Sequence, residues 1–113
     1  MRLTALTTLL DLLFVMKTKE IYENVLGVVE EVTDMPRCAI LSSNQEECVD
    51  ARFLLVFTLS RMLTDSEIAR LTGRTRRGIA YLRTSDHKLH KWLVGKNWED
   101  IKKRLGNDYY LRS

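Results

Sequence analysis

Residues 64–83 of this 113-residue chain read TDSEIARLTGRTRRGIAYLR, and their pattern predicts two short helices joined at a glycine. Thr64 followed three positions later by Glu67 forms a capping-box pattern, which marks a helix start by pairing otherwise unbonded backbone N–H groups. Gly73 stands where a short turn needs a positive φ. The second helix is predicted over 75–83. The spacing fits a generic helix-turn-helix, with Ala69 where the two helices approach closely and Gly73 at the turn.

Most of the remaining chain also has helical periodicity. Apolar residues recur at three- and four-residue steps over 17–32, and this helix is expected to stop before Pro36, because a residue before proline is disfavoured in the α region. Ser43 with Glu46 repeats the capping-box pattern and predicts the longest helix over 43–63, with an apolar spine. The members of that spine are Val49, Phe53, Leu54, Phe57 and Leu63.

Two more helices are predicted toward the C-terminus. One is capped by Ser85 or Asp86, and a last one runs from Asn97 to Leu105 and is ended by Gly106. No sustained period-two alternation is present, so no sheet is expected. With 113 residues, the chain is long enough for one compact all-α core and too short for two.

Charge is distributed unevenly along the sequence. Residues 1–60 hold five Lys and Arg against nine Asp and Glu, whereas residues 61–113 hold thirteen against six. A basic half favours a polyanionic partner, since each cation docked on a phosphate releases condensed counterions. A solvated basic face explains the charge equally well, so the charge alone leaves both interpretations open.

The arginines of the opening stretch favour nucleic acid. Thr75, Arg76 and Arg77 open the second predicted helix, and Gly78 would let the backbone approach a ligand closely. Arginine can bind guanine or a phosphate with two hydrogen bonds. Cations are disfavoured by the dipole at a helix N-terminus, so their presence there indicates a functional role. Three further arginines are expected to contact phosphates, namely Arg70, Arg74 and Arg83, and Lys88 is placed on the same DNA-binding surface.

From Ile21 to about Arg83 the chain resembles the C-terminal DNA-binding domain of the bacterial replication initiator DnaA, a helical domain related to the Trp repressor. The segments "VVEEV", "AIL", "VDAR" and "EIARLTGRTRRGI" follow that family's order and spacing. Of the family signature G-R-D-H-T-T-V, the chain keeps only Gly73, Arg74 and an apolar Ile79. The resemblance implies a Trp-repressor-like helix-turn-helix, with major-groove contacts from the residues between that Gly-Arg pair and Ile79.

Two differences from the family limit what the resemblance implies. The family's basic loop before the long helix is replaced by Ser43, Asn44, Gln45 and Glu46, which weakens the expectation of a minor-groove contact. No G-x-x-x-x-G-K-[ST] loop occurs, so the initiator's ATPase module is missing from this sequence. The chain therefore resembles the DNA-binding domain of the initiator without its ATPase module.

Three segments are predicted on this basis. Residues 1–16 are either an extra amphipathic helix or sequence upstream of a true start at Met16, residues 17–84 form the DnaA-like domain, and residues 85–113 add C-terminal helices packed on it. The apolar opening is too short for a membrane span and has no cleavage site. Cytoplasmic localisation with free, mostly buried thiols at Cys38 and Cys48 is expected.

Metal binding and catalysis find little support in the sequence. His87 and His90 could join Cys38 and Cys48 at a zinc ion, but their spacing does not match common structural zinc ligands. No nucleophile, base and orienting group are placed together, so no enzyme activity and no cofactor are expected. Arg52, among apolar neighbours, is expected to pair with Asp50 or with a carboxylate of the 17–32 helix.

Two functional hypotheses follow. The first is a small regulator or replication-related reader that binds double-stranded DNA, with a homodimer left open and no small-molecule substrate evident. The second is a protein-interaction module that uses the helix-turn-helix as a scaffold, supported by the non-basic loop 44–46. Apolar residues beyond the family match would form core or a dimer seam, namely Trp92, Leu93, Trp98, Ile101, Leu105 and Tyr109.

Overall fold

A computed structural model describes the backbone of residues 2–109 and the side chains of residues 16–106. Over this part of the chain the secondary structure is entirely helical, which confirms the all-α prediction. In chain order the elements are α1 (Arg2–Thr33), α2 (Arg37–Ser42), α3 (Glu46–Leu59), α4 (Asp65–Thr72), α5 (Arg76–Arg83), the 3-10 helix η1 (Asp86–His90) and α6 (Trp92–Tyr109).

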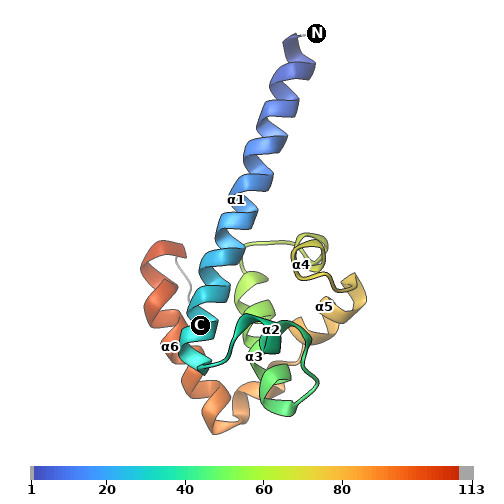
Figure 1. The fold of residues 1–113 in the computed structure, drawn as a ribbon. Helices are drawn as coiled ribbons and strands as arrows, with labels where there is room; N and C mark the ends of the chain where they lie inside the picture. Colours follow the sequence, from blue (N-terminus) through green and yellow to red (C-terminus); the bar gives the residue numbers. More distant parts are fainter. Residues whose placement is uncertain (1, 110–113) are drawn as a thin grey trace.

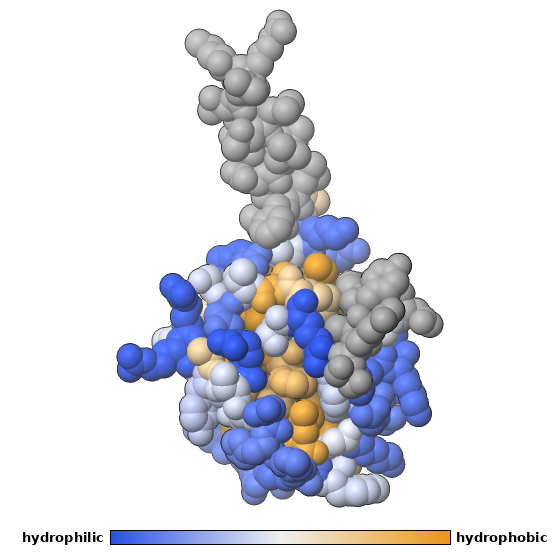
Figure 2. Space-filling view, turned by 180° about the vertical axis from the view of Figure 1, so that it is seen from behind, coloured by the Kyte–Doolittle hydropathy of each residue, from blue (hydrophilic) through white to orange (hydrophobic). Residues whose placement is uncertain are grey.

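Helix α3 is the centre of the fold. It packs against α1, α2, α5 and α6, and every residue from Ala51 to Val56 is buried. A helix that is apolar on nearly all sides must be covered on nearly all sides. In Figure 1, α6 lies on one side of this centre and α4 with α5 on the other. From behind, apolar surface remains visible as a band between polar flanks (Figure 2).

Helix α1 is longer than predicted. It runs without a break from Arg2 to Thr33, so the expected start at residue 17 and the segment boundary at residue 16 both fall inside it. Its second half packs on α3 and α6, while its first half projects beyond the globular part (Figure 1). It ends as expected before Pro36, where Asp34 takes a positive φ of 55°. From residue 16 onward, where its side chains are described, α1 buries Thr18, Tyr22, Val25, Leu26 and Val29.

The start of α3 corrects the predicted capping box at Ser43. Helix α3 begins at Glu46 after Gln45, which makes no side-chain cap. The Ser43 hydroxyl instead accepts a hydrogen bond from the Gln45 backbone N–H at 3.2 Å. The unpredicted helix α2 occupies the chain up to Ser42, so Ser43 ends one helix and is too early to begin the next. With 14 residues against 32, α3 is also shorter than α1.

The C-terminal helices differ from the prediction as well. Asn97 lies inside α6, and Gly106 does not end that helix. The segment after Ser85 forms only η1, which folds back against the start of α6. Gly95 permits this close packing, because a Cβ there would lie 2.8 Å from the Leu89 carbonyl oxygen.

Two glycine substitutions test this packing. Gly95→Ala should lower the free energy of unfolding, because the new methyl group collides with backbone. Gly27→Ala, in open space within α1, should instead raise it by about 0.5–1 kcal/mol through helix propensity. Chemical denaturation of both variants checks the pair. Equal effects would show that η1 does not press on α6.

Candidate nucleic-acid interface

Helices α4 and α5 with their connecting turn form the α4–α5 unit, residues 64–84. The predicted capping box is confirmed: the Glu67 N–H donates to Thr64 Oγ1 at 3.2 Å, and the Thr64 N–H donates to Glu67 Oε1 at 2.8 Å. Gly73 ends α4 in the left-handed conformation with φ 72°, also as predicted. The inner contacts of the unit are apolar and buried, and they involve Ile68, Ala69, Ile79 and Leu82.

The start of α5 is organised by Thr75. Its Oγ1 accepts a hydrogen bond from the Gly78 N–H at 3.0 Å, so Thr75 caps α5. A Cβ at Gly78 would lie 3.1 Å from that oxygen, which is tight enough to disturb the cap. An open hollow of about 570 Å³ adjoins this helix start, between the end of α2 and the α4–α5 turn. Its lining residues are Leu41, Ser42, Thr72, Gly73, Arg74, Thr75 and Gly78.

One face of α5 points away from the core. Ile79 and Leu82 are buried, whereas the residues on the other side of the helix are exposed or, at Ala80, half-buried. Tyr81 is 71% exposed, although its ring is large and mostly apolar. We call this surface the outer face of α5, and its members are Arg76, Arg77, Ala80, Tyr81 and Thr84.

Three of the predicted contact residues carry cations that the protein itself leaves unneutralised. Arg70, Arg76 and Arg77 are exposed, and no carboxylate among the described side chains forms an ion pair with them. Arg76 and Arg77 occupy the first turn of α5, at the positive end of its dipole. Their charge is therefore costly in the free protein and available to an anion.

Arg74 is held inside the protein. Its Nη2 donates to the Leu41 carbonyl oxygen at 2.8 Å, and its backbone N–H donates to the Ala69 carbonyl oxygen at 3.0 Å. The side chain is half-buried, and its Nε is buried without a hydrogen-bond partner among the described atoms. The guanidinium thus fastens the α4–α5 turn to α2 rather than extending into solvent.

Arg52 acts on the same helix end and corrects the predicted ion pair with Asp50 or α1. Its Nε donates to the Ile40 carbonyl oxygen at 2.8 Å, and its Nη2 donates to the Ser43 carbonyl oxygen at 2.6 Å. Carbonyls at a helix C-terminus lack intrahelical partners and attract cations. Both guanidinium groups therefore lie at the end of α2, and burial and then the nearby charge of Arg74 lower the pKa of Arg52.

Arg83 and Lys88 also have partners within the protein. Arg83 donates from Nε and Nη2 to the two oxygens of Asp65, each at 3.0 Å, which ties the end of α5 to the start of α4. This hydrogen bonding to Asp65 raises the pKa of Arg83. Lys88 Nζ lies 2.9 Å from Asp50 Oδ1 and is mostly buried. Of the eight predicted contact residues, Arg74, Arg83 and Lys88 therefore serve the fold.

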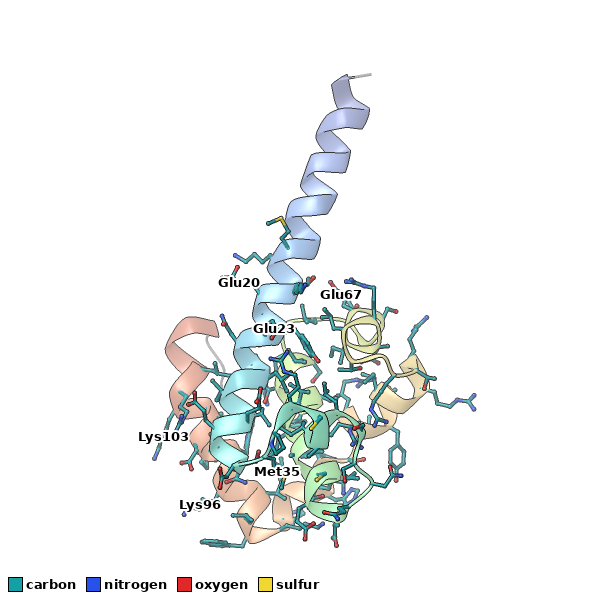
Figure 3. All side chains as sticks on the ribbon, viewed as in Figure 1. Glu20, Glu23, Met35, Glu67, Lys96 and Lys103 are labelled. Carbon is teal, nitrogen blue, oxygen red and sulfur yellow. The ribbon has the colours of Figure 1, made fainter. Side chains whose placement is uncertain are left out.

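The basic residues of α6 lie elsewhere. Figure 3 shows Lys96 and Lys103 extending from α6 on the side of the molecule opposite α4 and α5. Lys91 Nζ pairs with Glu46 at 2.6 Å and Asp50 at 2.9 Å. The basic residues of the second half of the sequence are thus divided between α6 and the α4–α5 unit.

A second surface is apolar. Trp92 and Leu93, at the start of α6, are 76% and 57% exposed, while Trp98, Ile101 and Leu105 are buried in the core as predicted. Beside Leu93 lies a groove of about 130 Å³ between α1, α3 and α6. Its apolar members are Met35, Ala51, Leu54, Leu93 and Val94. Tyr109 lies outside the described side chains.

The cysteines and histidines do not gather. Cys48 is buried and Cys38 exposed, so the expectation of buried thiols holds for one of the two. Among the described side chains, no three metal-ligating groups come together. Within the same part of the chain, no helix combines the length and apolar character needed to cross a membrane.

Comparison with family models, curated proteins and solved structures found no match to this chain. The outer face is therefore defined by geometry alone. Ala80, Tyr81 and Thr84 belong to it but were not predicted as contact residues. Helical periodicity could have found them, because Ile79 and Leu82 face inward and place residues 77, 81 and 84 outward.

Replacing Arg74 tests its role as a fastener. Arg74→Ala should lower the free energy of unfolding by about 1–3 kcal/mol, because the Leu41 carbonyl loses a charged donor. Arg70→Ala, one turn away and exposed, should change it by less than about 0.5 kcal/mol. Denaturant titrations measure both, and a neutral Arg74→Ala variant would contradict the assignment.

Asp50 makes stability depend on pH. Burial raises the pKa of Asp50, but hydrogen bonds from Lys88 and Lys91 outweigh it, and the folded pKa lies below the ordinary value. A lowered folded pKa means stability that is fully present above the ordinary carboxyl range and is lost as the pH falls through the folded pKa. The Asp50→Asn variant should therefore have a lower free energy of unfolding than the parent at pH 7. Its free energy of unfolding should fall less than that of the parent as the pH is lowered. An equal fall in the free energy of unfolding of parent and variant between pH 7 and acid would contradict this role for Asp50.

Proposed function

We propose that this protein binds double-stranded DNA by placing the outer face of α5 in the major groove. The observation that carries the proposal is the pair Arg76 and Arg77, exposed and without a carboxylate partner among the described residues, on the first turn of a helix whose opposite side is buried. A helix fits the major groove, which is about 12 Å wide. The α4–α5 unit then serves as a helix-turn-helix.

The start of α5 suits a phosphate-lined groove for a second reason. First-turn N–H groups of a helix have no acceptor within the helix and can bind phosphate oxygens. The adjacent hollow leaves room for a DNA strand beside Ser42 and Thr75. Arg70 is exposed at the end of α4, where an additional phosphate contact would add affinity for any sequence.

The resemblance to the DnaA DNA-binding domain supports the same function and remains a prediction. On that model the fold is Trp-repressor-like and the protein acts as a regulator or replication-related reader without the initiator's ATPase. Arg74, Arg83 and Lys88 then act through the fold, so phosphate contacts are reduced to Arg70 and the start of α5. A homodimer also remains a prediction.

Removing two charges from α5 tests the proposal. Purified protein is incubated with a pool of random duplexes at two salt concentrations, and bound sequences are recovered. The parent should enrich one motif. The Arg76→Ala/Arg77→Ala variant should lose about 1–3 kcal/mol per base contact, or flatten the slope of log affinity against log salt by about one per phosphate contact.

A matched control removes the same charge from the other side. The Lys96→Ala/Lys103→Ala variant should bind as the parent does, because both lysines lie on α6 away from α5 (Figure 3). If both double variants lower the DNA affinity equally, the affinity depends on the net charge of the protein and not on α5. Binding that disappears with salt and enriches nothing would contradict a sequence reader.

We infer a second candidate function, protein interaction, from the exposed Trp92 and Leu93 at the start of α6, of which Leu93 lines an apolar groove. Tryptophan is enriched among the residues that dominate the binding energy of protein interfaces. A parent protein that binds no duplex even at low salt would favour this candidate. Trp92→Ala/Leu93→Ala should then abolish partner binding, while Arg76→Ala/Arg77→Ala should leave it intact.

A further inference from the structure

Resting on the DNA binding proposed above, we propose that Tyr81 determines sequence preference by packing its ring against the methyl group of a thymine. The side chain is 71% exposed on the outer face of α5. Its backbone carbonyl is used within the protein, accepting from the Thr84 and Ser85 hydroxyls at 3.2 Å and 2.7 Å. Among the described side chains the ring takes part in no aromatic stacking and no cation–π contact.

The position of Tyr81 matters more than its exposure, since single exposed apolar side chains are common. Tyr81 follows Arg77 by four residues, so the two side chains share one helical face. Four residues advance along a helix by about 6 Å. Base pairs are spaced about 3.4 Å apart, so Tyr81 reaches a base pair one or two steps from the one that Arg77 contacts.

The chemistry of the groove identifies the ligand. In the major groove, guanine offers two acceptors that match arginine, and thymine offers the only apolar group, its C5-methyl. Ala80 and Thr84 flank Tyr81 and contribute further methyl groups to the same surface. The outer face thus changes from cationic at Arg76 and Arg77 to apolar one turn later. A site with guanine followed within two base pairs by thymine matches this order.

Thymine-to-uracil replacement isolates the contact, because it removes one methyl group and keeps base pairing. Each thymine of the selected duplex is replaced in turn by deoxyuridine, and binding of parent, Tyr81→Ala and Tyr81→Phe is measured. The parent should lose about threefold to fivefold in affinity at one or two positions, the effect of one buried methyl group. Tyr81→Phe should keep this loss, whereas Tyr81→Ala should bind thymine and uracil duplexes equally.

Trp92→Ala is the control, since Trp92 is equally exposed but lies on α6. It should retain the parent's response to uracil. If uracil has no effect on the parent, or if Tyr81→Ala keeps the full loss, Tyr81 does not read thymine, although DNA binding stands. If the parent selects no duplex at all, the proposed DNA binding fails and this inference fails with it.

Discussion

The hydrogen bonds of two arginines to carbonyl oxygens at the end of α2 are the interaction on which the geometry of the candidate site depends. Arg52 reaches from the central helix α3, and Arg74 reaches from the turn before α5. Together they bind three carbonyl oxygens, those of Ile40, Leu41 and Ser43. Hydrogen bonds from these two side chains therefore join α2 both to the core and to the turn before α5, and α5 itself packs on α3 and α4.

Arginine has two separate roles in this protein. Arg52, Arg74 and Arg83 donate hydrogen bonds to carbonyl or carboxylate oxygens of the protein. These hydrogen bonds offset the cost of removing the guanidinium groups from water. Arg70, Arg76 and Arg77 remain exposed beside them. The first group joins α4 and α5 to each other and to α2, and the second group is exposed on these two helices. A count of basic residues in the sequence cannot separate the two roles.

Features encoded by neighbours in sequence could be predicted, and those created by distant contacts could not. The capping box of Thr64 and Glu67 and the positive φ of Gly73 depend on residues within one turn, and both were predicted. The predicted cap at Ser43 was wrong because α2, which packs against α3 and α1, takes up the chain as far as Ser42. The partner of Arg52 could not be foreseen either, because backbone carbonyls carry no signature in the sequence.

The outer face of α5 could be predicted in part from the sequence. The sequence places Arg76 and Arg77 at the start of this helix. Tyr81 carries no charge, so a prediction of contact residues from charge does not include it. Lys88 as a DNA contact stays a prediction, and the structure adds that its ammonium group pairs with Asp50, 38 residues away in the chain. Local sequence pattern predicts the start of α5, whereas the internal partners of its basic neighbours follow from tertiary contacts.

The most direct measurement is a map of amide chemical shifts while duplex DNA is added to the protein. DNA recognition by α5 predicts that the largest changes fall on residues 70–84 and on the end of α2, with α6 unaffected. Changes centred on Trp92, Leu93 and the groove beside them would contradict it and would place the binding surface of this protein at the start of α6.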